Sequence, residues 1–190
     1  SGITSSRAWM AEALGIEAQD LAESYARATT EPLTWREVDN APVQQVRHDA
    51  PLDLAQLLPI PTHSEHDNGA YITAGLFIVR NPNTGIQNVS INRCQLSGPD
   101  RLGVLILPRH AHFFYEQAEA TGEPLEVAIA IGADPACLLA SQAILPVDCD
   151  ELEVAGALLG SPLAVTQCLS SEIRVPAEAE IVIEGRILPK

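Results

Sequence analysis

Three residues with ligand-type side chains stand at the ends of expected secondary-structure elements. Asn88 opens a β-rich run, His110 directly follows an apolar run, and Glu151 stands in the first turn of an expected helix. An amide oxygen, an imidazole and a carboxylate suit a divalent ion such as Mg²⁺ or Mn²⁺, and a phosphate could fill the positions left open. The structural alternative is a solvent-facing Asn88, a partly buried His110 and a capping Glu151.

Two arginines accompany these three residues. Arg93 closes the run that Asn88 opens, and Arg109 immediately precedes His110. A guanidinium carries forked donors that match a carboxylate or a phosphate. The sequence therefore offers ligands for a cation and, beside them, donors for an anion.

A second candidate metal site lies in a polar loop. His63, Glu65, His66 and Asp67 occur within five residues. Their spacing fits no strong zinc pattern. A solvated loop that is hydrogen-bonded to itself is the favoured interpretation.

The composition excludes several classes of partner. Acidic residues number 25 against 11 basic ones, for a net charge of −14. This charge repels nucleic acid and anionic membranes. The four cysteines form no C-x-x-C pair, so free thiols are expected. With no signal-peptide core near the start and no membrane-length apolar run, a cytoplasmic location is expected.

The elements that must position the candidate residues begin with a hairpin. The apolar run 76–79 and the run 88–93 flank a turn at 81–85, and the alternation in 88–93 predicts a strand with its polar face toward water. Gly75 suggests a bulge or a close approach to the backbone. The run 102–107 predicts a strand buried on both faces. The expected core residues are Val104, Leu105, Ile106, Val127, Ile129 and Ile131.

The remaining elements complete an α+β chain of about six strands, arranged as a small barrel or a curled sheet. Helices are expected at 8–14 and 16–28, with a proline-rich linker to residue 61 that holds one helical turn near 53–57. One further helix is expected to end at Gly122, one to begin at Asp134, and one to begin at Cys149 or Asp150. Strands are expected at 125–131, 163–168 and 179–184. We expect residues 1–60 to form the tail of a preceding domain and a linker, and residues 61–190 to form the functional domain.

Seven short motifs in order resemble the UbiD-type reversible decarboxylases, which act with prenylated FMN. They cover residues 59–187 and include Asn88-Val89-Ser90-Ile91-Asn92-Arg93 and Pro108-Arg109-His110. The other five are Tyr71-Ile72-Thr73-Ala74-Gly75, Gly122-Glu123-Pro124-Leu125, Gly132-Ala133-Asp134-Pro135-Ala136, Glu151 ahead of Ala155-Gly156-Ala157-Leu158-Leu159-Gly160, and the run 175–185.

The resemblance implies a flavin-binding split β-barrel with flanking helices and a decarboxylase of an aromatic or α,β-unsaturated acid. Asn88, His110 and Glu151 match the positions that hold Mn²⁺ or Mg²⁺ against the flavin phosphate. K⁺ would sit beside them, near the carbonyls of Val89, Ser141 and Ala143. Arg93 matches the catalytic arginine. The positions that line the cofactor are Thr73, Asn88, Ser90, Ile91, Asn92, Arg93, Arg109, His110, Gln142 and Ala143. A homo-oligomer is implied for the full-length protein.

The sequence departs from the family in length and in detail. Family members are typically more than twice as long, and their acidic pair follows the region that matches Glu184-Gly185, so a middle fragment that is inactive alone is expected. Asn88 and Arg93 are five residues apart, so both face one cofactor only if the strand starts late or contains a bulge. The alternative is a flavin-binding split barrel without decarboxylase activity, either reductase-like or non-enzymatic.

Overall fold

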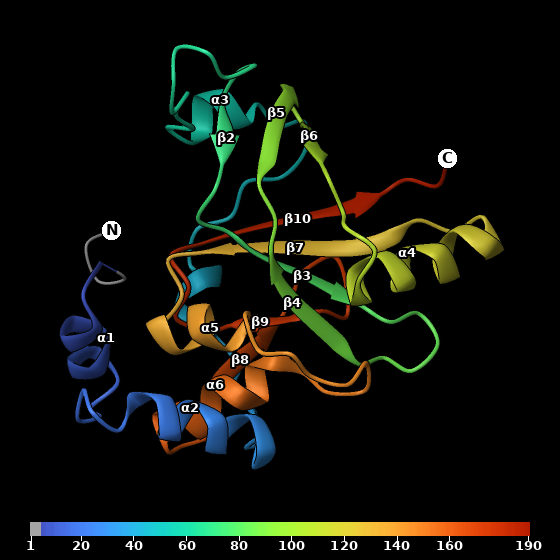
Figure 1. The fold of residues 1–190 in the computed structure, drawn as a ribbon. Helices are drawn as coiled ribbons and strands as arrows, with labels where there is room; N and C mark the ends of the chain where they lie inside the picture. The colour runs from blue at the N-terminus through green and yellow to red at the C-terminus, as the bar shows by residue number, and fades with distance from the viewer. Residues whose placement is uncertain (1–4) are drawn as a thin grey trace.

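Three β-sheets organise the chain, with helices at their ends and faces (Figure 1). The structure, a computed structural model, describes residues 5–190. The helices are α1 (Arg7–Ala13), α2 (Leu21–Thr30), the 3₁₀ turn η2 (Pro42–Gln44), α3 (Leu54–Leu57), α4 (His110–Thr121), α5 (Pro135–Ala140) and α6 (Glu151–Leu159). The strands are β1 (Arg36–Glu37), β2 (Tyr71–Ile72), β3 (Leu76–Arg80), β4 (Gln87–Ile91), β5 (Cys94–Gly98), β6 (Arg101–Val104), β7 (Leu125–Ile131), β8 (Ala164–Gln167), β9 (Arg174–Pro176) and β10 (Ile181–Ile187).

The central sheet has the strand order β10-β7-β3-β4, and all of its pairs are antiparallel. The predicted hairpin is confirmed as β3 and β4, with Val79 opposite Asn88 and Ile78 opposite Val89. β4 is an edge strand of this sheet. The backbone N–H and C=O groups on its outer side are therefore not paired with another strand and can bind other groups.

Two smaller sheets lie at opposite ends of the molecule in Figure 1. In one of them β8 lies between β1 and β9, close to α2, α5 and α6, while β2, β5 and β6 form the other beside α3. The proline-rich segment before residue 61 supplies β1, which pairs in parallel with β8. It also supplies the predicted helical turn, which is confirmed as α3.

The central sheet separates two hydrophobic cores, and alternate residues of β3 and β7 point into opposite ones. Leu76 and Ile78 pack with α5, α6, β8 and β9, whereas Phe77 and Val79 pack with α4. In β7, Ala128 and Ala130 join the first core, and Val127 and Ile129 join the second. The apolar residues on both faces of these strands follow from this two-sided burial.

The expected fold class is confirmed in part. The chain is a mixed α+β protein, but the strands of residues 5–190 form three separate sheets and no closed barrel of about six strands. β2 and β5 leave the central sheet because irregular backbone separates them from β3 and β4. Within the described residues, no helix is both long enough and apolar enough to cross a bilayer.

The run 102–107 is not a strand buried on both faces. β6 ends at Val104 and pairs only with β5, so its side chains alternate between partial burial and exposure. Leu105 is 67% exposed and Leu107 is 56% exposed. Of the expected core residues, Val127 and Ile129 are buried, whereas Val104, Ile106 and Ile131 are only partly buried.

The structure also tests the predictions for the helix ends, the cysteines and Gly75. The helix predicted from residue 16 begins only at Leu21. The predicted helix end at Gly122 and the starts after Asp134 and Asp150 are confirmed. All four cysteines are free thiols, as expected. The close approach predicted at Gly75 is confirmed, because a Cβ there would clash with Cγ2 of Ile129.

Candidate functional site

The edge of β4 and the first turn of α6 bring together two of the three candidate metal ligands. Nδ2 of Asn88 donates to Oε1 of Glu151 at 2.8 Å, and the backbone N–H of Val89 donates to Oε2 at 2.7 Å. Both side chains are buried, and Glu151 is only 3% exposed. Asn88 therefore does not face water as the alternation suggested, because the start of α6 lies against the outer edge of β4.

Glu151 and its neighbour Asp150 are both buried carboxylates. Burial raises the pKa of Glu151 to about 7 and that of Asp150 to about 6, because a charged carboxylate loses its hydration there. The hydrogen bonds from Val89 and Asn88 pull the pKa of Glu151 the other way without outweighing burial. Two adjacent buried carboxylates thus share one helix start.

The donor set fits a divalent cation. No arginine, lysine or histidine within residues 5–190 forms an ion pair with Asp150 or Glu151. Buried charges are normally paired or bound to metal. A bound Mg²⁺ or Mn²⁺ would supply the missing positive charge, with the oxygen of Asn88 and the carboxylate of Glu151 as ligands.

His110 approaches the same region from another element. It is the first residue of α4, which packs against β3 and β4. Asn88 is opposite Val79, whose side chain lies in the core that α4 shares, so Asn88 faces the α4 side of the sheet. The partly exposed imidazole of His110 forms no hydrogen bond with Asn88 or Glu151 in the described chain.

The geometric problem between Asn88 and Arg93 has a simple solution. β4 ends at Ile91, and β5 begins at Cys94, so Asn92 and Arg93 belong to neither strand. The break frees Arg93 from the strict alternation of a continuous strand. The late start is not observed, because β4 begins at Gln87, and its pairing with β3 shows no bulge. Arg93 is exposed, and Asn92 donates to Oγ of Ser90 at 2.8 Å.

The other candidate cofactor residues lie in loops and at element ends. Arg109 is the exposed N-cap of α4, and Ile91 is 44% exposed at the end of β4. Thr73 is exposed between β2 and β3, where its Oγ1 lies 3.4 Å from Nε2 of His63. Gln142 and Ala143 follow α5, and Gln142 donates to Oγ of Ser141.

The polar loop 63–67 is hydrogen-bonded to itself. The N–H of Ser64 donates to Oδ2 of Asp67 at 2.9 Å, and Nε2 of His63 lies 3.2 Å from the carbonyl oxygen of Tyr71. His63, Glu65, His66 and Asp67 are all exposed. Across residues 5–190, no group of three or more His, Cys, Asp and Glu side chains is placed to hold a metal, so this loop offers no such cluster.

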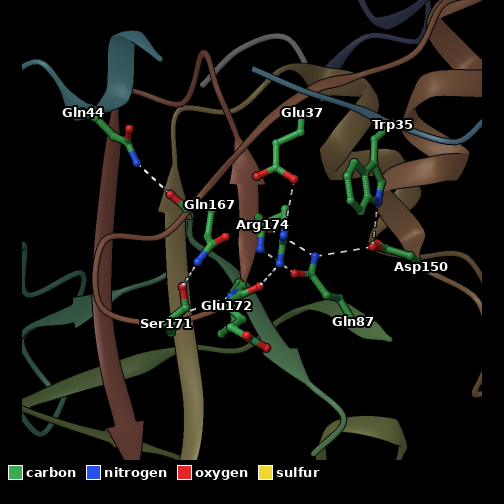
Figure 2. Close-up of polar contacts among 10 residues, drawn as sticks. Trp35, Glu37, Gln44, Gln87, Asp150, Gln167, Ser171, Glu172 and Arg174 are labelled. Atoms are coloured by element: carbon green, nitrogen blue, oxygen red, sulfur yellow. Dashed lines mark hydrogen bonds and ion pairs between the residues drawn. The ribbon is translucent and has the colours of Figure 1, made fainter. Parts of the chain in front are cut away.

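Three residues beside the site were missed by sequence reasoning. Gln87 and Trp35 both donate to Oδ2 of Asp150, at 3.4 Å and 3.2 Å (Figure 2). The sequence gives only one indication of a role for Gln87 and Asp150, which is that they precede Asn88 and Glu151. Nothing in the sequence reports that Trp35 reaches Asp150, because 115 residues separate them.

A separate cavity of about 490 Å³ lies between the segment 43–58 and β10. Cys168, Leu169 and Ser170 also line it. None of the candidate ligand or cofactor residues lies on its wall. The cavity therefore adds nothing to the site at β4 and α6.

Comparison with known families gives a match over most of the chain. Residues 36–190 match the UbiD family, described as the 3-octaprenyl-4-hydroxybenzoate carboxy-lyase Rift-related domain.

Two curated relatives are decarboxylases by name. An anhydromevalonate phosphate decarboxylase of Methanothermobacter thermautotrophicus is 48% identical over 136 residues, which are 72% of this chain and 32% of that protein. A phenolic acid decarboxylase of Bacillus subtilis is 34% identical over 162 residues, which are 83% of this chain and 34% of that protein. The chain thus spans about a third of the length of these relatives.

Solved structures of related enzymes match the fold of this chain. The UbiD-class enzyme HmfF from Pelotomaculum thermopropionicum in complex with FMN has a TM-score of 0.96 and 49% identity, and the match covers 99% of this chain and 43% of that one. An evolved dimeric form of HmfF, in complex with prFMN, has a TM-score of 0.95. The 3,4-dihydroxybenzoic acid decarboxylase of Klebsiella pneumoniae has a TM-score of 0.90 and 35% identity, and the match covers 41% of its chain.

Proposed function

The chain belongs to the UbiD family, and on this premise we propose that it forms the cofactor-binding part of a decarboxylase. The reaction would remove CO₂ from an aromatic or α,β-unsaturated carboxylic acid with the help of prenylated FMN. HmfF structures with FMN and prFMN support the choice of cofactor. The names of the relatives support the class of reaction.

The observation that carries the proposal is the buried Asn88–Glu151 pair, which lacks a cationic partner among the described residues. Asn88, His110 and Glu151 would hold Mn²⁺ or Mg²⁺, and the metal would in turn hold the flavin phosphate. The carbonyls of Val89, Ser141 and Ala143 would hold K⁺.

The remaining residues have roles toward the flavin and the substrate. The prenylated flavin, when bound, supplies an electron sink for the electron pair that the departing CO₂ leaves behind. Arg109, exposed at the start of α4, would donate to the phosphate. Arg93, exposed at the break after β4, would orient the substrate carboxylate.

Metal binding in the presence of FMN tests the proposal. Mn²⁺ titrations of the wild type, Glu151→Gln and His110→Ala should show weaker binding in both variants, by at least about tenfold. Glu153→Gln is the matched control, because Glu153 stands in the same helical turn but makes no contact with Asn88. Unchanged affinity in both variants would contradict the metal site and favour a flavin-binding module without decarboxylase activity.

Turnover is a separate question from cofactor binding. The resemblance implies that the family's proton donor is a glutamate, and no residue of this 190-residue sequence matches that position. A general acid is typically worth about 10²–10⁴-fold in rate, and an arginine cannot replace it. We therefore expect no multiple turnover from this polypeptide assayed alone with prenylated FMN. Sustained CO₂ release would contradict that expectation.

A further inference from the structure

A second hydrogen bond between β4 and the start of α6 lies next to the Asn88–Glu151 pair. It joins Gln87, which precedes Asn88, to Asp150, which precedes Glu151. Nε2 of Gln87 donates to Oδ2 of Asp150 at 3.4 Å. The same Oδ2 accepts from Nε1 of Trp35 at 3.2 Å, and Oδ1 accepts from the N–H of Leu152 at 2.9 Å. Every oxygen of this buried carboxylate is thus held.

Gln87 is anchored on its other side by the backbone of β9. Its Oε1 accepts from the N–H of Arg174, and its Nε2 donates to the carbonyl oxygen of Arg174 at 3.1 Å. The side-chain amide therefore binds Arg174 as a neighbouring strand would (Figure 2). Because these bonds use backbone atoms, they do not depend on the arginine side chain, which pairs instead with Glu37 at 3.3 Å.

The first turn of α6 therefore contacts β4 through two successive residue pairs. Gln87 bonds Asp150, Asn88 bonds Glu151, and the N–H of Val89 closes the contact at 2.7 Å from Glu151. We propose that the Gln87–Asp150 bond acts as a clamp that positions Asn88 and Glu151 as ligands. The clamp would tie β4 to β9 and to the helix start, so that the two ligands cannot drift apart when no metal is bound.

This inference rests on the proposed function for its consequence, which is tighter metal binding. Partners that orient metal ligands typically contribute about 10–100-fold to affinity. Gln87 and Asp150 are positioning residues in this scheme, since neither is itself proposed to touch the metal or the flavin.

The test uses two variants of the whole chain. Gln87→Met keeps the length of the side chain but removes all three of its hydrogen bonds. Asp150→Asn keeps an acceptor for the Leu152 cap but turns an amide donor toward Trp35 or Gln87. In a double-mutant cycle their effects should be less than additive, because each variant breaks the same bond.

Two controls match these variants. Asp134→Asn makes the same substitution at the same type of helix cap, because Oδ1 of Asp134 accepts from the N–H of Ala136 at 2.8 Å. Arg174→Ala removes the ion pair with Glu37 but leaves the backbone that Gln87 binds. Neither substitution should change the positions of Asn88 and Glu151.

Two readouts decide the outcome. The first is Mn²⁺ affinity with FMN present, expected to fall about tenfold or more in Gln87→Met and Asp150→Asn but not in the controls. The second needs no metal: hydrogen exchange of the Val89 amide, which Glu151 holds, should accelerate about tenfold in the same two variants. The Ser90 amide, which points toward β3 in the alternating ladder, should keep its protection and so exclude general unfolding.

Each result has one meaning. Faster exchange at Val89 alone, together with weaker Mn²⁺ binding, supports the clamp. Unchanged exchange at Val89 in both variants overturns it, as does equal acceleration in the controls. If the wild-type chain with FMN binds no Mn²⁺, the proposed function fails, and exchange at Val89 still decides whether the clamp positions the pair.

Discussion

The side-chain nitrogen of Asn88 lies 2.8 Å from a carboxylate oxygen of Glu151, although 63 residues separate the two in the chain. The contact joins the open edge of a sheet to the start of a helix. It directs the amide nitrogen of Asn88 at Glu151, so its amide oxygen is the atom left for a cation. The two candidate ligands are therefore arranged as one unit before any metal binds.

Stability of the metal-free chain should depend on pH through this unit. Burial raises the pKa of Glu151 to about 7 and that of Asp150 to about 6. The folded chain therefore keeps protons that the unfolded chain releases above roughly pH 4, the ordinary range of these groups. Protonated Asp150 and Glu151 therefore contribute fully to the free energy of unfolding below that pH, and this contribution is lost as the pH rises toward 7.

We expect the free energy of unfolding to fall between about pH 4 and 7, with a contribution on the order of 3 kcal/mol from Glu151. Urea denaturation of wild type and Glu151→Gln at several pH values would measure it. The variant should show a shallower fall, because it cannot titrate. Equal slopes in the two proteins would mean that Glu151 does not carry the effect. Adding Mn²⁺ with FMN should restore stability to the wild type above pH 7.

Arg109 should discriminate between flavins that do and do not carry a phosphate. As an exposed N-cap of α4, its guanidinium is free to donate to an anion. We expect Arg109→Gln to weaken FMN binding by about 10–100-fold, the range of one or two charge-assisted bonds. Riboflavin, which has no phosphate, should bind both proteins equally in a fluorescence titration.

Arg101→Gln controls for the loss of one positive charge, because Arg101 is also exposed but lies on β6 outside the candidate site. It should leave FMN affinity within about twofold. A comparable loss for FMN in the Arg101 variant, or a loss for riboflavin in the Arg109 variant, would contradict a phosphate contact at Arg109.

Ile129 and Leu105 should respond very differently to truncation, although the sequence suggested that both are core residues. Ile129 is 5% exposed in the core beneath α4, whereas Leu105 is 67% exposed beyond the end of β6. Ile129→Ala should cost about 2–4 kcal/mol, and Leu105→Ala less than about 0.5 kcal/mol. Chemical denaturation of both variants would measure the two costs. Similar values for the two would contradict the burial assigned here.

The hairpin and the helix ends could be predicted because their signals are local. The turn 81–85, the αL glycine at Gly122 and the cap at Asp134 act over a few residues. The burial of Asn88 could not be predicted from alternation, because it depends on a helix 63 residues further along. The same limit hid the role of Gln87, whose partners Asp150 and Arg174 lie 63 and 87 residues further along the chain.

Predictions about strands failed where an apolar run did not reveal its neighbours. β3 and β7 are apolar on both faces because a core lies on each side of their sheet. The run 102–107 has a similar composition but pairs with one strand only, so part of it faces outward. Composition could not distinguish these two cases, since a short apolar run fits either environment.

Gly156 should be needed to keep α6 in its place. In an open helix, Gly→Ala stabilises by roughly 1 kcal/mol. Here an added Cβ would lie 2.9 Å from the carbonyl oxygen of Leu33 and 3.2 Å from the nitrogen of Leu163, and both are backbone atoms that cannot rotate away. The substitution should therefore push α6 away from the segments that lead into β1 and β8.

We expect Gly156→Ala to destabilise the chain by about 1–3 kcal/mol, the range for overpacking. Because α6 carries Glu151, the shift should also weaken Mn²⁺ binding in the presence of FMN. Ala157→Gly is a control within the same helix, since it should cost roughly 1 kcal/mol through helix propensity without moving the helix. Denaturation and Mn²⁺ titration of both variants separate the two effects. A stabilising Gly156→Ala, or equal loss of Mn²⁺ affinity in the two variants, would show that the contact with Leu33 does not position the ligand.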